Sequence, residues 1–144
     1  MTVIEKSIEI KVPPENVWPL LFWDRAPEYN DMIKDVKSIS EKRGEMGATY
    51  HVIADARGRS YRYDVEMTEI VKYERLGWRS IAGDWTASGV NILEPVKAGT
   101  KVTMKMDYTL PGLSNKIVDI LFARREIEKG NEKALEKLKS ILEK

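Results

Sequence analysis

The end of the chain limits the fold most, because Ser114 to Leu142 has the periodicity of one long amphipathic helix. A helix of roughly thirty residues spans about 45 Å. Its apolar stripe is made of Ile117, Ile120, Leu121, Ile127, Ala134, Leu135, Leu138 and Leu142. Such a stripe must be buried, so we expect the rest of the chain to form a surface that covers it.

Two polar residues, Arg124 and Asn131, fall within this stripe on the helical wheel. A buried charge without a partner is costly, so Arg124 needs water, a protein partner or a ligand. The two side chains are spaced to hold a carboxylate, a phenolate or a carbonyl of a bound molecule. Alternatively, Arg124 pairs with Asp64, Glu66 or Glu128, or extends its charged end to the rim.

The preceding sequence predicts one strand, two short helices and then an antiparallel sheet. Val3 to Val12 alternates as a half-buried strand does, and Pro13-Pro14 ends it. Short helices are expected through Trp18 to Trp23 and around Glu28 to Met32. From Asp35 to Leu110, alternating residues and turn signals predict strands with one apolar face, in a sheet of roughly seven strands.

Composition indicates one domain and excludes several kinds of site. The chain has 144 residues, of which 42% are hydrophobic, and a net charge of +1 that gives no support to a nucleic-acid partner. With one histidine and no cysteine, we expect no metal site, and no glycine-rich loop suggests a cofactor. The chain shows no signal-peptide pattern or membrane-spanning apolar run, so we expect it in the cytoplasm.

Four stretches carry a resemblance to a known superfamily. They are SIEIKVPPENVWPLL (7–21), MTEIVKYERLGWR (67–79), GVNILEPVKAGTKVTMKMDYTLPG (89–112) and KALEKLKSILE (133–143). With this element order, the chain resembles the START-like (helix-grip) superfamily, in particular the polyketide cyclase/dehydrase and lipid transport family. The resemblance covers essentially the whole chain. It implies a single α+β domain over residues 1–144, with a curved seven-stranded antiparallel sheet wrapped around the C-terminal helix and two short helices after the first strand.

The same resemblance implies a cavity between the sheet and the helix. Its expected ligand-binding residues are Tyr61, Tyr63, Met67, Trp78, Met104, Met106 and Tyr108, together with Arg124 and Asn131. Tyrosine and methionine suit a mostly hydrophobic ligand with a few oxygen atoms. The alternative is that these residues pack against one another and leave no void.

Three classes of function remain open from the sequence. The first is binding or transport of a small hydrophobic ligand such as a lipid, an isoprenoid quinone or a polyketide-like aromatic, with transient membrane contact. The second is a polyketide cyclase, aromatase or dehydratase that uses tyrosine and arginine in the cavity, although no catalytic residue is assigned. The third is a protein-interaction module such as a chaperone regulator. The expected state is a monomer or a weak homodimer.

Four further positions need an explanation. His51, near Asp55, is the only histidine, and strand alternation places it on the solvated face rather than in a catalytic site. Phe122 and Val118 point away from the helix stripe, so they either pack against neighbouring elements or form an exposed patch for dimerisation or membrane docking. Gly130 lowers helix stability by about 1 kcal/mol relative to alanine and indicates a bend or a close approach.

Overall fold

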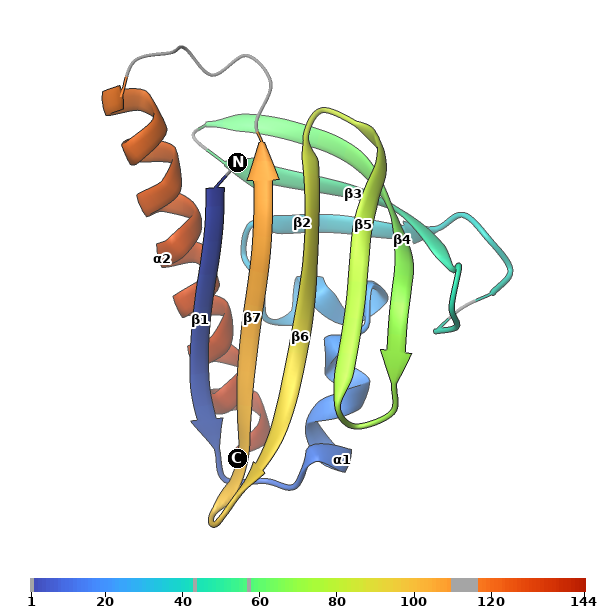
Figure 1. Ribbon diagram of the computed structural model, residues 1–144, viewed down its shortest axis with the longest axis vertical. Helices are drawn as coiled ribbons and strands as arrows, with labels where there is room; N and C mark the ends of the chain where they lie inside the picture. Colours follow the sequence, from blue (N-terminus) through green and yellow to red (C-terminus); the bar gives the residue numbers. More distant parts are fainter. Residues whose placement is uncertain (1, 43, 57, 110–116) are drawn as a thin grey trace.

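The computed structural model describes residues 2–42, 44–56, 58–109 and 117–144, with only the backbone described for 117–120. A seven-stranded antiparallel sheet in the order β1-β7-β6-β5-β4-β3-β2 forms the framework. Figure 1 shows the sheet curving so that β2 and β3 cross the direction of β1, β7 and β6. The strands are β1 (Thr2–Ile10), β2 (Ile33–Ser38), β3 (Thr49–Ala56), β4 (Arg59–Val71), β5 (Arg75–Gly83), β6 (Thr86–Val96) and β7 (Gly99–Thr109). This order confirms the predicted α+β helix-grip fold.

The short helices depart in detail from the prediction. Helix α1 (Pro14–Val17) passes directly into the 3-10 helix η1 (Trp18–Leu21), with Pro19 in its first turn. Proline has no N–H to donate, so the tighter turn begins where an α-helical hydrogen bond is lost. The second segment is η2 (Trp23–Glu28), earlier than the predicted Glu28 to Met32, because Asp31 and Met32 form the turn that leads into β2.

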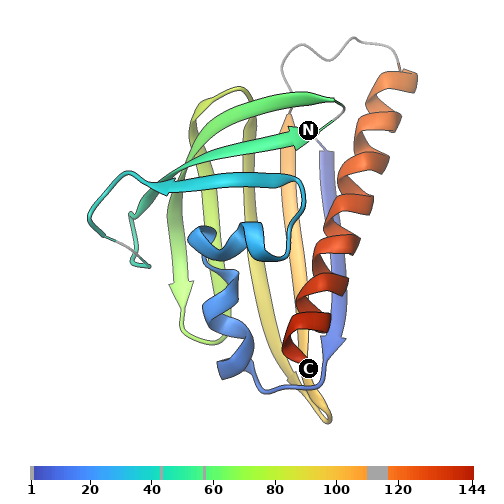
Figure 2. The ribbon, with the colours of Figure 1, turned by 180° about the vertical axis from the view of Figure 1, so that it is seen from behind.

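The long helix α2 (Ile117–Leu142) follows the edge strand β1 along the sheet. Figure 2 shows α2, the short helices and β2 on the side of the sheet that faces the viewer. Ile127, Ala134, Leu135 and Leu138 of the predicted stripe are buried. They join a core that takes inward residues from every strand of the sheet, among them Val52 of β3, Val65 of β4 and Val102 of β7.

The prediction that the apolar stripe of the helix is buried is wrong at Leu121. Leu121 is 58% exposed, because it lies about 120° around the helix from the buried Ile127, at the margin of the buried face. Phe122 is 59% exposed, which fits the surface interpretation of this position. Residues 114–116 and the side chains of Ile117, Val118 and Ile120 lie outside the described part of the structure.

Candidate ligand-binding cavity

A partly open cavity of about 120 Å³ lies between the sheet, the short helices and α2. At about 30 Å³ for each water molecule in the liquid, this volume is the space of about four waters, so a void is present and it is small. The walls combine the inward face of the strands with Leu21, Trp23 and Ala26 from the short helices, and with Ile127 and Asn131 from α2. The cavity therefore lies where the helix and the curved sheet do not fill the space between them.

Most of the predicted site residues meet at this cavity. Tyr61, Tyr63, Met67, Trp78, Met104, Met106 and Asn131 line it, whereas Tyr108 and Arg124 are outside its wall. Tyr108 is buried instead with Ile4 and Ala123, beneath the first half of α2. Strand alternation therefore selected the correct face but not the position along it, because the cavity occupies only part of that face.

Aromatic rings form one wall, and two of them, Trp23 and Trp85, were not predicted from the sequence. Trp23 of η2 packs edge-on against Trp78, with ring centroids 5.1 Å apart, and also contacts Tyr63. Trp85 also contacts Tyr63, with ring centroids 5.2 Å apart. Trp85 follows a turn, and apolar and polar residues alternate poorly in the segment that it begins. The side of the sheet that Trp85 faces could therefore not be predicted. Such rings supply a large, rigid apolar surface for a flat ligand.

A single glycine makes room for this wall. Gly89 of β6 pairs with Trp78 of β5, and the indole lies across the glycine backbone. A Cβ atom at position 89 would lie 2.8 Å from three indole atoms. The position of Trp78 in the cavity wall therefore depends on the missing side chain at Gly89.

The inward polar groups are neutral. Tyr63 is 2% exposed, and burial raises the pKa of its hydroxyl, so the group keeps its proton. Asn131 is 5% exposed, and its Nδ2 donates only a weak hydrogen bond to Met106 Sδ, at 3.5 Å. Trp85 Nε1 is buried without a hydrogen-bond partner in the described part of the chain. Buried polar groups are usually satisfied, so this wall keeps unused hydrogen-bonding capacity.

Charged side chains do not project from the described wall into the cavity. Asp55 and Lys105 border the cavity but are exposed residues. Lys105 alternates with Met104 and Met106, and Asp55 shares the facing of His51, so both charged ends are directed to the other face of the sheet. A bound molecule would therefore meet apolar groups, hydroxyls, amides and indoles.

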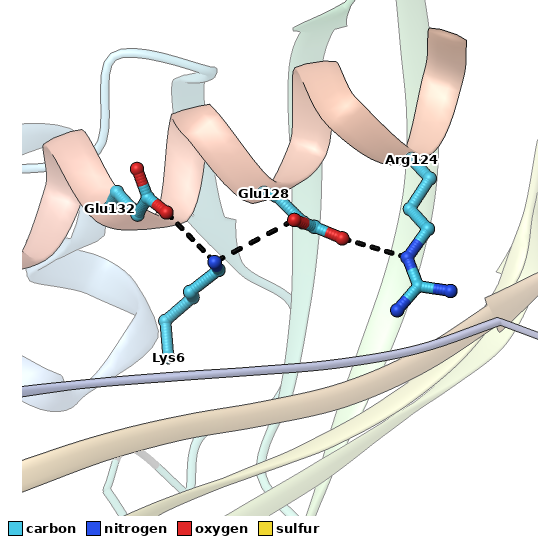
Figure 3. Close-up of polar contacts among 4 residues, drawn as sticks. All are labelled: Lys6, Arg124, Glu128 and Glu132. Carbon is cyan, nitrogen blue, oxygen red and sulfur yellow. Dashed lines mark hydrogen bonds and ion pairs between the residues drawn. The ribbon is translucent and has the colours of Figure 1, made fainter. Parts of the chain in front are cut away.

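Arg124 belongs to an ion-pair network between α2 and β1 rather than to the cavity wall (Figure 3). Its Nε lies 2.7 Å from Glu128 Oε1, and Lys6 of β1 lies 2.8 Å from Glu132 and 3.6 Å from Glu128. The hydrogen bond from Arg124, with Lys6 nearby, lowers the pKa of Glu128. The structure therefore agrees with the alternative prediction, in which Arg124 pairs with Glu128 on the same helix. The network also joins α2 to the edge strand β1.

We expect Arg124→Leu to change the free energy of unfolding by less than about 0.5 kcal/mol, because the Arg124 side chain is 49% exposed and its ion pair is solvated. We also expect ligand affinity to remain unchanged. Urea unfolding and titration with a cavity ligand measure the two effects, with Glu128→Gln as the control for the lost pair. Loss of affinity without loss of stability would instead place Arg124 in the ligand site.

His51 has the facing that alternation predicted. Its neighbours Tyr50 and Val52 are buried toward the core, whereas His51 Nδ1 lies 2.6 Å from Asp64 Oδ1 on the opposite face. The carboxylate partner is thus Asp64 rather than the nearby Asp55, because β3 and β4 pair His51 directly with Asp64. This pair lies away from the cavity and gives it no general base.

The comparisons with known proteins agree with this architecture. Residues 1–143 match the family described as polyketide cyclase / dehydrase and lipid transport. The chain belongs to this family. Membership in the polyketide cyclase/dehydrase and lipid transport family supports a ligand-binding or polyketide cyclase role, without deciding between them.

Individual proteins are also similar to this chain in sequence or in structure. An uncharacterized 17.2 kDa protein in the melC2-rnhH intergenic region of Streptomyces lincolnensis is 26% identical over 145 residues, covering 99% of this chain and 91% of that protein. The crystal structure of TTHA0849 from Thermus thermophilus matches with a TM-score of 0.80 at 20% identity, covering 96% of this chain and 95% of that one. The Zhui aromatase/cyclase from Streptomyces sp. R1128 matches with a TM-score of 0.81 at 13% identity, covering 99% and 93%. These two structures support the fold alone.

The described residues of this family member offer no group of three or more His, Cys, Asp or Glu side chains that could hold a metal ion. In the same part of the chain, no helix is long and apolar enough to cross a membrane. The candidate site is the aromatic cavity with its neutral polar groups.

Proposed function

We propose that the protein binds a small, uncharged and largely apolar molecule in the cavity between the sheet and α2. The observation that carries this proposal is the character of the wall, where aromatic rings surround buried polar groups that are neutral. Transferring a carboxylate to such a site without a cationic partner would be strongly unfavourable. A ketone, quinone or phenol loses far less solvation, so a polyketide-like aromatic or a quinone fits better than a free fatty acid.

In this proposal Tyr63 donates a hydrogen bond to a ligand oxygen. The burial that raises the Tyr63 pKa keeps the donor protonated across the physiological pH range. Asn131 offers a second donor, because its contact with the sulfur of Met106 is weak and exchangeable. Tyr61, Met67, Trp78, Met104 and Met106 supply the apolar surface that contacts the rest of the molecule.

A cyclase or dehydratase is the second candidate function. Family membership supports it, and the Tyr63 hydroxyl could stabilise negative charge on a ligand carbonyl oxygen by donating a hydrogen bond, although burial raises its pKa and makes it a weak proton donor. The described wall lacks an inward carboxylate or imidazole to act as a strong base. Binding is therefore the primary proposal, and turnover of a bound polyketide-like compound with loss on Tyr63→Phe would favour the enzyme.

Native mass spectrometry followed by denaturing extraction tests the proposal directly. We expect a stoichiometric, uncharged, apolar adduct on protein purified from its host. A matched pair of probes then tests the charge preference, because acetophenone and benzoate share one ring and differ in charge. Acetophenone should bind more tightly, and equal or tighter binding of benzoate would contradict a neutral site.

Tyr63→Phe should weaken acetophenone binding by about two- to tenfold, the effect of losing one hydrogen bond. Isothermal titration calorimetry measures this change. Tyr73→Phe is the matched control, because it removes the same oxygen atom from a tyrosine that does not line the cavity. If both variants bind like the unmodified protein, Tyr63 does not contact the ligand.

A further inference from the structure

Gly130 is the helix residue for which the sequence offered no firm explanation, and the structure shows what covers it. The side chain of Met32 lies across the glycine, on the surface of α2. A Cβ atom at position 130 would lie 2.5 Å from Met32 Sδ and 3.3 Å from Met32 Cγ. Gly130 is therefore a notch in α2 that receives the methionine, and this close approach accounts for a glycine in the middle of a helix.

The backbone of Met32 is held in place on several sides. Met32 N–H donates to Asn30 Oδ1 at 3.0 Å, and the Met32 carbonyl accepts from Asp55 N–H of β3 at 2.8 Å. The adjacent Asp31 pairs with Lys137 of α2 at 2.9 Å, which ties the turn to the helix. The position of the turn is thus fixed, whereas the unbranched Met32 side chain can rotate about its own bonds without breaking these contacts.

Met32 also belongs to the cavity wall, where it stands beside Asn131 and Ile33. The cavity of about 120 Å³ has room for a molecule of about one six-membered ring, since an engineered cavity of about 150 Å³ binds benzene. A larger ligand must displace part of the wall. Tyr63, Met67 and Leu76 are fully enclosed by the core and resist displacement. Met32, Met104 and Met106 are each half-buried, but Met104 and Met106 lie on β7 between two paired strands, whereas Met32 lies in a turn.

We propose that Met32 sets the size of the ligand that the cavity accepts. With Met32 in the Gly130 notch, the cavity holds an uncharged one-ring compound. An uncharged compound with two fused rings enters when the Met32 side chain leaves the notch and turns toward solvent. This inference rests on the proposed binding function, and it assigns size selection to a residue in a turn rather than to the sheet.

Affinities of two probes for Met32→Ala and for the unmodified protein test the role of this side chain. Acetophenone is the one-ring probe, and naphthyl methyl ketone carries the same oxygen on two fused rings. We expect Met32→Ala to bind the two-ring probe about tenfold more tightly, because it no longer displaces a side chain, and to change one-ring binding much less. Met46→Ala is the matched control, since Met46 is an exposed methionine outside the cavity.

The results separate this inference from the proposed function. An unchanged ratio of the two affinities in Met32→Ala, with both probes bound, would overturn the role of Met32 and leave the binding function standing. Failure of every protein to bind either probe would overturn both. If Met32→Ala does not fold, methyl-labelled methionine NMR of the unmodified protein, assigned with Met32→Leu, replaces it. The two-ring probe must then shift the Met32 methyl signal more than the one-ring probe does, and equal shifts would overturn the inference.

Discussion

Leu138→Ala is expected to lower the free energy of unfolding by about 2 to 5 kcal/mol, one of the two largest effects that we predict. Leu138 is fully buried and lies in the main core with Ile10 and Val102 of the sheet. Its truncation would leave a cavity between α2 and the sheet that the surrounding strands cannot close. Urea unfolding followed by circular dichroism measures the change.

Leu121→Ala is the matched control for Leu138→Ala, because it makes the same substitution on the same helix at an exposed position. Its effect should stay within about 0.5 kcal/mol. Comparable losses in the two variants would mean that α2 packs on the sheet through a different face.

Gly89→Ala is expected to lower the free energy of unfolding by about 1 to 3 kcal/mol, although alanine is normally the better strand residue. The added methyl group would overlap the Trp78 indole, which is rigid and has Trp23 packed against it. Relief of this overlap requires a shift of the aromatic wall, so ligand affinity should fall as well. Thermal unfolding and tryptophan fluorescence report the two effects.

Making Gly89→Ala in a Trp78→Leu variant tests whether contact with Trp78 causes the loss of stability. In Trp78→Leu protein the indole is absent, so Gly89→Ala should become neutral or stabilise by up to about 1 kcal/mol. An equal loss of stability in both backgrounds would show that the strand pairing at Gly89, rather than its contact with Trp78, requires glycine.

Strand alternation and helix periodicity predicted the order of strands and helices, whereas the curved sheet and the cavity followed from the resemblance to the START-like superfamily. Most of the predicted site residues line the cavity. Tyr61, Tyr63 and Met67 share one parity on β4, and all three line the cavity. The helical wheel was less reliable for Arg124, because it gives the direction of a side chain at the backbone and not where the long side chain ends. Glu128, one turn further on, pairs with the guanidinium on the solvent-exposed side of the helix.

The remaining parts of the site depend on contacts between distant segments. Trp23 and Met32 come from the short helices and the following turn, where no simple period indicates which side chains face inward. The contact of Met32 with Gly130 joins residues from opposite ends of the chain. A glycine in a helix signals a close approach, but only the folded structure identifies the partner.

The attachment of α2 to β1 combines two interactions that respond differently to ionic strength. Lys6, Glu128 and Glu132 are solvated, and mobile ions screen such pairs over about 8 Å at physiological salt. The apolar contacts of Ala134 and Leu138 beneath them are not weakened by salt. The helix thus has a salt-insensitive inner attachment and a salt-sensitive outer one, so concentrated salt would loosen the outer contact between α2 and β1 before it affects the core.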